Sequence, residues 1–371
     1  MQTLTDWNRT QRRILLFGTF TTIILALTCA SSIWRASAQD PMDDDMDMRP
    51  FVRPIGRAGA LVDDGFVPTP SADPTYTRLD YPDALLTVAF DINNTGHIVG
   101  FYRDSNLAFH GFVYNRVTRS FASIDYTNPI CTTGTDARGI NERGDIVGTC
   151  TDSANPANFY GYLLTADGFT PIQVPGHLST IPQRISSDGD IVGCIHDTNM
   201  TTTMFGMLRD AAGFDLFGGM FGGLNGIGFM HNGVSPAGRN VVGMFMDTTV
   251  NRPRAYVLSD GVPIPFDYPG ATLTQAWDVN AQGDVVGVYR DTAGRIHGFL
   301  RSAQDEFTSI DFPGATLTRA FGMNTNGDIV GTYVAAGVQH AFVRSTKGPA
   351  NKLGGLALGR GVRNAQPKSL W

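Results

Sequence analysis

Three histidines stand at equivalent places in a repeated pattern and could in principle ligate a metal ion. His110, His297 and His340 each precede a Gly-Phe or Ala-Phe pair. Imidazole is a common ligand of zinc and copper. These three residues fall on separate repeats, at equivalent positions far from any shared centre, so they cannot converge on one ion. We therefore expect them to pack or to form hydrogen bonds, and the sequence predicts no metal site.

Two acidic turns resemble calcium-binding loops. They are residues 91–96 (DINNTG) and 278–283 (DVNAQG). A calcium loop has a carboxylate at its fifth position and a bidentate Glu downstream. Both turns lack the first feature, and Tyr102 and Tyr289 replace the second. Asn followed by Gly favours tight hairpin turns, which explain these segments better.

The cysteines that follow the N-terminal segment could form a disulfide or act as nucleophiles. Cys131 and Cys150 stand at the two ends of a predicted hairpin, which would bring them together. We expect them to form a disulfide, as exported proteins do, and Cys194 to be an unpaired, buried thiol. No Cys-His-Asp arrangement with local support points to nucleophilic catalysis. The sequence predicts no catalytic residue and no cofactor.

All these candidates lie within a repeat that occurs six times. Its most regular part is Ile-Val-Gly or Val-Val-Gly, at residues 98–100, 146–148, 191–193, 241–243, 285–287 and 329–331. The spacing of about 44 to 50 residues is typical of a propeller blade. In the fifth repeat, alternating segments between turns predict four strands, over residues 272–279, 284–289, 297–300 and 307–312.

The two ends of the repeat array indicate how it closes. The sixth repeat has three strands and no fourth. Residues 76–82 (YTRLDYP) match the fourth strand of the fifth repeat, residues 307–313 (FTSIDFP). An N-terminal strand that completes the last blade removes the exposed edges of an open array. The sequence therefore predicts an all-β fold, a six-bladed β-propeller with four antiparallel strands per blade, over residues 76–344.

The third strand of the repeat carries a family signature. His340-Ala341-Phe342 is its full form, and the segments that begin at His110 and His297 are close variants. On these residues the chain resembles the bacterial extracellular repeat group called the HAF family. The resemblance covers residues 76–344 and implies a secreted, propeller-like protein, with no activity attached to it. Repeats three and four depart from the signature, so the blade does not require the His.

The segments outside the repeats predict export. Arg9, Arg12 and Arg13 precede an apolar run over residues 14–30, and Ala-Ser-Ala at residues 36–38 fits a cleavage site. Residues 1–38 are thus predicted to be a signal peptide, with an uncleaved anchor as the alternative, and the export route stays open between the general and twin-arginine pathways. We expect an acidic, Pro- and Asp-rich disordered arm over residues 39–75 and a basic disordered tail over residues 345–371.

The net charge bears on the partners. The whole chain carries a formal charge of −6. Removal of the four arginines and one aspartate of residues 1–38 leaves about −9. This sign argues against nucleic acid as a partner. We expect an extracytoplasmic monomer, secreted or periplasmic, that touches a membrane only if the N-terminal segment is uncleaved.

Positions that vary between repeats indicate where function could reside. Three residues before the turn Asn or its equivalent, the first strands carry Phe90, Arg138, Gln183, Asn232, Trp277 and Phe321. The position two residues earlier also varies, and period-two alternation places both on one strand face. Insertions at residues 128–134 and 218–228 would open on the same end of the ring. Our site hypothesis is a pocket lined by Asp136, Arg138, Gln183, Gln275, Trp277, Arg319 and Phe321. The alternative is that these residues fill the channel.

Three functions are compatible with this sequence. The first is an exported non-catalytic module that binds a ligand or a protein, with Trp277 and Phe321 stacking on a glycan at the channel mouth. The second is a hydrolase or lyase of extracellular glycans, in which Asp136 pairs with Asp91 or Asp278. Those acids are expected on different blades and alternating strand faces, which weakens the enzyme hypothesis. The third is a structural protein of the cell envelope. Fold alone does not decide between them.

Overall fold

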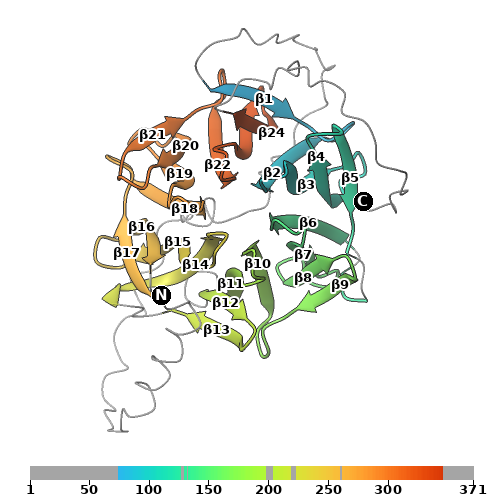
Figure 1. The fold of residues 1–371 in the computed structure, drawn as a ribbon, viewed down its shortest axis with the longest axis horizontal. Coiled ribbons are helices and arrows are strands. Elements are labelled where there is room, and N and C mark those ends of the chain that lie inside the picture. Colours follow the sequence, from blue (N-terminus) through green and yellow to red (C-terminus); the bar gives the residue numbers. More distant parts are fainter. Residues whose placement is uncertain are drawn as a thin grey trace, which may run out of the picture.

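The computed structural model describes residues 74–126, 129–131, 133–197, 204–218, 223–259 and 261–345. Six sheets of four antiparallel strands are arranged around a central channel (Figure 1). The predicted six-bladed propeller is confirmed. The predicted signal peptide and almost all of the acidic arm and basic tail lie outside the described residues. Within the described ranges, no helix is long and apolar enough to cross a membrane.

Each blade is named here by its innermost strand. The β2 blade contains β2 (Leu86–Ile92), β3 (His97–Arg103), β4 (Phe109–Asn115) and β5 (Ser120–Ile124). The β6 blade contains β6 (Thr133–Ile140), β7 (Ile146–Thr151), β8 (Phe159–Thr165) and β9 (Gly168–Ile172). The β10 blade contains β10 (Ser179–Ile185), β11 (Ile191–His196), β12 (Phe205–Asp210) and β13 (Gly213–Phe217).

The remaining blades complete the ring. The β14 blade contains β14 (Gly226–Val234), β15 (Asn240–Asp247), β16 (Arg252–Ser259) and β17 (Val262–Phe266). The β18 blade contains β18 (Leu273–Val279), β19 (Val285–Arg290), β20 (Ile296–Arg301) and β21 (Phe307–Ile310). The β22 blade contains β22 (Leu317–Met323), β23 (Ile329–Ala335), β24 (Val338–Ser345) and, as its outermost strand, β1 (Thr75–Leu79).

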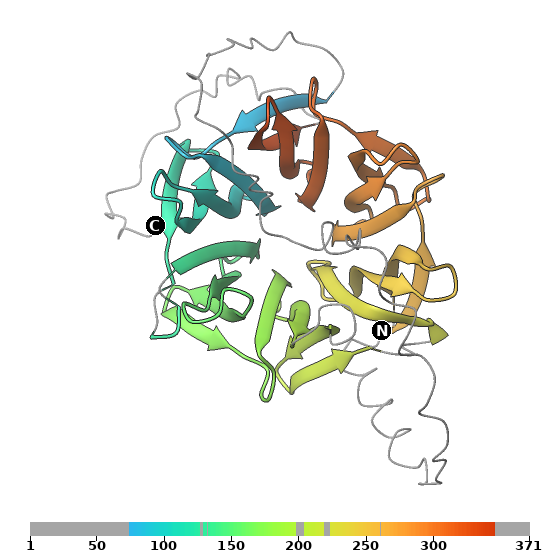
Figure 2. The ribbon, with the colours of Figure 1, turned by 180° about the vertical axis from the view of Figure 1, so that it is seen from behind.

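The N-terminal strand closes the ring as predicted. β1 pairs antiparallel with β24, with Leu79 opposite Ala341 and Thr75 opposite Ser345 (Figure 2). The Nδ1 atom of His340 lies 2.8 Å from a carboxylate oxygen of Asp80, just after β1. Strands from the two ends of the array therefore share one sheet, and no blade of the ring is left incomplete.

One irregularity repeats in all six blades. Each first strand has one extra, unpaired residue where it pairs with the Ile-Val-Gly segment, which makes a β-bulge. In the β2 blade, Ala89 lies opposite Gly100 and Asp91 lies opposite Val99, so Phe90 is the extra residue. The bulge directs a first-strand carbonyl oxygen, that of Val88 in this blade, at the Gly. A Cβ on Gly100 would overlap that oxygen, and the equivalent Gly of every other blade faces the same conflict. The bulge thus explains why Gly recurs in the repeat.

The blades pack through aromatic side chains. The Phe of the His-Ala-Phe signature, or the Tyr that replaces it, is fully buried in five blades: Phe112, Tyr162, Tyr256, Phe299 and Phe342. Rings also stack between successive blades, for example Phe312 on Tyr333 with centroids 3.6 Å apart. Burial of each such ring contributes roughly 1.5–3 kcal/mol.

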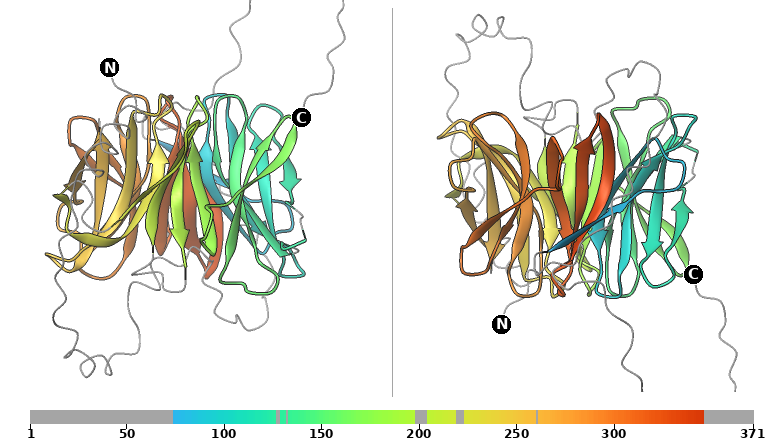
Figure 3. Two further views of the ribbon diagram at one scale, coloured as in Figure 1. Left: turned by 90° about the horizontal axis from the view of Figure 1, so that it is seen from below. Right: turned by 90° about the horizontal axis from the view of Figure 1, so that it is seen from above.

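The ring has two different faces. The strands run from one face to the other (Figure 3). One face, called the turn face here, carries the tight turns that link the first and second strands, such as Asn93 to Gly96. The opposite face, called the loop face, carries the connections between blades and the turns between second and third strands. The described residues of the two insertions noted in the sequence, 129–131, 133–134, 218 and 223–228, stand between one blade and the next or begin the first strand of the next blade.

Candidate functional site

The bulged residue of each first strand points into the channel. These residues are Phe90, Arg138, Gln183, Asn232, Trp277 and Phe321. Each is buried, with 0 to 5 % of its surface exposed. Neighbours in this ring touch one another: Trp277 contacts Phe321, Phe321 contacts Phe90, and the guanidinium of Arg138 lies over the Phe90 ring. Their side chains therefore fill the channel at this level.

Three of the predicted site residues form one polar network. Arg138 donates hydrogen bonds from Nε and Nη2 to Asp136 Oδ2, at 3.0 and 2.7 Å, and from Nη1 to Gln183 Oε1 at 3.1 Å. The other carboxylate oxygen of Asp136 accepts from the backbone and hydroxyl of Thr149. Asp136 remains partly exposed at the loop face. The pair is therefore rigid, because each polar atom of the carboxylate has a fixed partner.

Two other predicted residues form an apolar wall. Trp277 and Phe321 meet edge to face, with centroids 4.9 Å apart, in a buried cluster with Phe90. No group in the described residues accepts a hydrogen bond from the buried Nε1 of Trp277, and none donates to the buried Oδ1 of Asn232 on the adjacent first strand. Buried Trp N–H groups usually have a partner, so this corner of the channel offers one unused donor and one unused acceptor.

The last two predicted residues lie closer to the loop face. Gln275 is buried and Arg319 is half-buried, each two residues before a bulge. Neither belongs to the Asp136 network. The structure thus places all seven predicted residues around one channel, but divides them into a charged side, an aromatic side and two residues nearer the mouth.

A residue absent from our site hypothesis, Arg184, crosses the channel below the bulges. It follows the bulged Gln183 on β10. Its Nη2 donates to the carbonyl oxygens of Phe90 and Phe321, both at 2.7 Å, and its Nη1 to those of Arg138 and Gln183 at 2.7 and 2.8 Å. One guanidinium therefore links four blades by hydrogen bonds to backbone.

Two buried carboxylates flank this guanidinium. Arg184 Nε lies 3.5 Å from Asp91 Oδ2 and 3.8 Å from Asp278 Oδ1, without a hydrogen bond to either. The two carboxylate oxygens are thus at most 7.3 Å apart, the sum of these distances. Each carboxylate also accepts two backbone N–H groups, one from its own blade and one from the next.

The electrostatics of this triad follow from one cation between two acids. Burial is the main cause that raises the pKa of Asp91, and it raises the pKa of Asp278 to about 7. The positive charge of Arg184 opposes both pKa shifts. The negative charge of Asp91 raises the pKa of Asp278 further. Because one guanidinium cannot neutralise two buried carboxylates, the second negative charge is disfavoured.

The bulge corrects one expectation from the sequence. Period-two alternation placed Asp91 and Asp278 on the opposite strand face from Asp136 and Trp277. In the structure, the bulge inserts an extra residue, so the next side chain also faces the channel and both acids reach the same guanidinium. The signal was present in the repeats: the position after the bulge alternates in the order Asp91, Gly139, Arg184, Gly233, Asp278 and Gly322.

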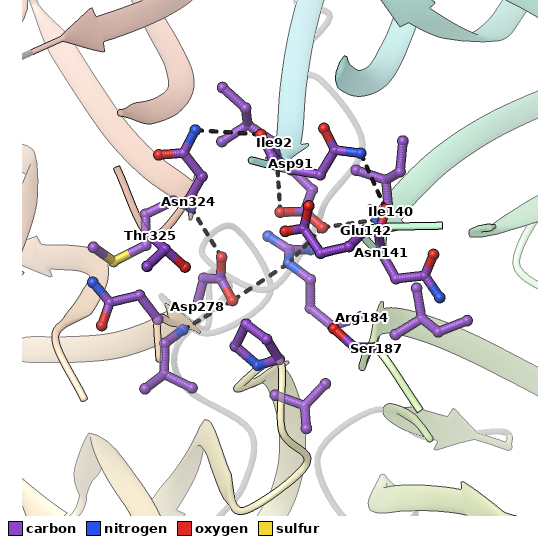
Figure 4. Close-up of a pocket in the computed structure, with 17 residues that line it drawn as sticks. Asp91, Ile92, Ile140, Asn141, Glu142, Arg184, Ser187, Asp278, Asn324 and Thr325 are labelled. Carbon is purple, nitrogen blue, oxygen red and sulfur yellow. Dashed lines mark hydrogen bonds and ion pairs between the residues drawn. The ribbon is translucent and has the colours of Figure 1, made fainter. Parts of the chain in front are cut away.

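A pocket opens on the turn face beneath this triad. It encloses about 430 Å³, part of which is open solvent, and Arg184, Asp91 and Asp278 line it with the turn asparagines (Figure 4). The asparagine amides are engaged in holding the turns together; Asn93 Nδ2, for example, donates to the backbone oxygen of Asn141 in the next blade. None of the seven predicted site residues lines this pocket.

The histidines of the repeat have partners within the sheet. His110 stacks on Tyr102 and its Nδ1 lies 2.7 Å from Asp125 Oδ1. His297 is placed in the same way against Tyr289 and Asp311. Across the described ranges, no group of three or more His, Cys, Asp or Glu side chains could hold a metal ion. A disulfide joins Cys131 and Cys150, and Cys194 is free and buried.

Comparison with known proteins gives distant structural matches only. No protein-family model matches the sequence, and no curated protein matches it. One solved structure that resembles the chain is TolB from Acinetobacter baumannii, with a TM-score of 0.45 and 12% identity. The match covers 72% of this chain and 65% of TolB, so the chain spans less than two thirds of the length of TolB. The fucose-binding six-bladed propeller lectin of Aleuria aurantia matches with TM-score 0.43 and 12% identity, over 71% of this chain and 97% of that one. A Dyadobacter fermentans protein of unknown function matches with TM-score 0.47 and 12% identity, over 72% and 98%.

Proposed function

We propose that the protein is an exported, non-catalytic β-propeller that binds a short glycan at the loop-face mouth of its channel. The observation that carries this proposal is the indole N–H of Trp277. It is buried beside the channel and has no acceptor among the described residues. An unsatisfied buried donor costs about 1–3 kcal/mol, which a ligand oxygen would recover once the side chains that cover this N–H group move aside.

The chemistry of the surrounding side chains suits a polyhydroxylated ligand. A sugar hydroxyl both donates and accepts, and it could bond to Trp277 Nε1 and to Asn232 Oδ1 together. Asp136 and Arg319 remain partly exposed nearer the mouth and make it polar. Trp277 and Phe321 are buried in one apolar cluster with Phe90, so we assign recognition to the unpaired polar atoms and not to stacking.

The two faces of the ring support this location. On the turn face the same contacts recur and join neighbouring blades, as Asn93 with Asn141 and Asn141 with Ser186. On the loop face the first-strand residues differ from blade to blade. Variable residues on a rigid ring are the usual arrangement of a binding site on a repeat scaffold.

The acid pair does not favour catalysis. Asp91 and Asp278 come within the range of separations found in glycosidases. Each carboxylate is only 5 % exposed and accepts two backbone N–H groups. A carboxylate fixed in this way holds neighbouring blades together and is poorly placed to receive or deliver a proton at a substrate.

Export is supported by the disulfide between Cys131 and Cys150, because such bonds persist in oxidising compartments. The predicted signal peptide points the same way. The resemblance to the HAF family rests on the third-strand signature, and we propose membership on that basis.

The test is a glycan-array screen of the purified protein, followed by calorimetry on each glycan that binds. Trp277→Phe keeps an aromatic ring and removes the N–H, so affinity should fall about tenfold, the value of one hydrogen bond of roughly 1.4 kcal/mol. Tyr289→Phe is the matched control, because it removes one hydroxyl, bonded to Ser309, far from the channel. The proposal fails if the folded protein binds no glycan, or if Trp277→Phe and Tyr289→Phe bind equally well.

A further inference from the structure

A cluster of sulfur-containing side chains lies between two neighbouring blades. Cys194, Met204, Met230 and Met244 form one buried group with Ile181. Each of the four sulfur-bearing residues has at most 5 % of its surface exposed. Seven of the twelve methionines of the chain fall between residues 200 and 246, so the group reflects a local concentration in the sequence.

The fold brings these residues together from separate strands. Cys194 lies on β11, opposite Ile181 of β10. Met230 lies on β14 of the next blade, directly opposite Met244 of β15. Met204 immediately precedes β12. Met230 occupies the position that Asp136 holds in its blade, so the fourth repeat carries sulfur where the second carries a carboxylate.

A histidine adjoins the cluster. His196 Nε2 lies 3.2 Å from Cys194 Sγ, and both side chains are buried. Two ligands of one tetrahedral ion, with metal–sulfur and metal–nitrogen bonds of about 2.3 and 2.0 Å, lie about 3.5 Å apart. A shift of about 0.3 Å would therefore let the two atoms share an ion.

We propose that Cys194 and His196 bind one copper(I) ion, with thioethers of the Met204, Met230 and Met244 group completing its coordination. Soft thiolate and thioether ligands select copper(I), and an imidazole is a common companion. Zinc(II) is bound by thiolate and imidazole, whereas thioether ligands favour copper(I), so the methionines distinguish the two ions. On binding, a copper–sulfur bond forms as the Cys194 S–H bond breaks, the proton leaves to solvent, and copper stays in the +1 state.

The simpler explanation is a thiol that donates a weak hydrogen bond to a histidine in an apolar core. The two explanations differ in metal binding. The purified protein is titrated anaerobically with copper(I), kept reduced by ascorbate, in competition with the chromogenic chelator bicinchoninate. We expect one tightly held ion per chain and a raised melting temperature.

Variants make the test specific to this cluster. Cys194→Ser should abolish tight binding, and Met230→Leu combined with Met244→Leu should weaken it by at least about tenfold. Met207→Leu is the matched control, because Met207 is equally buried but belongs to a different apolar cluster. If Cys194→Ser does not fold, the volume-conserving methionine variants decide the question. The proposal is overturned if bicinchoninate removes all copper from the folded protein, or if these variants bind copper as the Met207→Leu control does.

Discussion

Arg184 and Phe321 join opposite sides of the ring: the Nη2 atom of Arg184 lies 2.7 Å from the carbonyl oxygen of Phe321. Their strands, β10 and β22, belong to blades on opposite sides of the channel (Figure 1). The closure of a propeller usually depends on contacts between neighbouring blades. Here one buried cation adds a connection straight across the axis, next to two carboxylates that could not otherwise be buried together.

Arg184→Met should therefore lower the free energy of unfolding by about 3–5 kcal/mol, because it leaves two buried carboxylates without a cation and four carbonyls without a donor. The measurement is urea unfolding followed by circular dichroism. Arg143→Met is the control: Arg143 pairs with Asp145 on the exposed turn face, where an ion pair contributes at most about 1 kcal/mol. Equal losses in the two variants would contradict a structural role for the channel cation.

Asp278 should make the protein less stable as the pH rises. Its pKa is about 7 in the folded protein against an ordinary value of 3.8, so between about pH 4 and pH 7 the folded state holds a proton that the unfolded state has lost. The free energy of unfolding then falls with rising pH, by up to about 1.4 kcal/mol per unit. Urea unfolding at pH 5, 6 and 7 measures this slope. Asp278→Asn should flatten it, and an unchanged slope would show that the proton binds elsewhere.

The sequence was enough to predict the fold because its repeats carry the same information six times. The match between residues 76–82 and 307–313 predicted the strand exchange that closes the ring, and β1 pairs accordingly with β24. The variable first-strand residues, Trp277 and Arg138 among them, occupy the bulged positions of their strands, while the predicted binding role of these residues stays a prediction.

The hydrogen-bond partners of Arg184 could not be predicted from the repeats. Three of its four partners are backbone carbonyls of other blades, and a carbonyl is present whatever the side chain. The convergence of Asp91 and Asp278 was missed for a different reason, since a bulge breaks the two-residue period on which the assignment of strand faces depends. The sulfur cluster was missed because Cys194 and Met230 belong to repeats that depart from the common pattern.

The recurring glycine of the second strand should be essential at every blade. Gly287 faces the carbonyl oxygen of Gln275, which a Cβ would overlap, and the Phe299 ring leaves no room for relief. We expect Gly287→Ala to cost more than about 3 kcal/mol or to prevent folding. Gly294→Ala is the control, because Gly294 has φ +83° but open space around it. That variant should lose only about 1 kcal/mol, and thermal unfolding of both proteins separates steric overlap from backbone strain.

The disulfide should stabilise the β6 blade at its loop-face edge. Cys131 and Cys150 are 19 residues apart, and closing a loop of this size constrains the unfolded chain by roughly 3 kcal/mol. The double variant Cys131→Ala/Cys150→Ala should lose about that much in urea unfolding. A reductant should destabilise the natural protein to a similar degree and leave the double variant unchanged, because Cys194 has no partner cysteine. If the reductant destabilised both proteins equally, its effect would lie outside this disulfide, and the bond would not be the source of the stability.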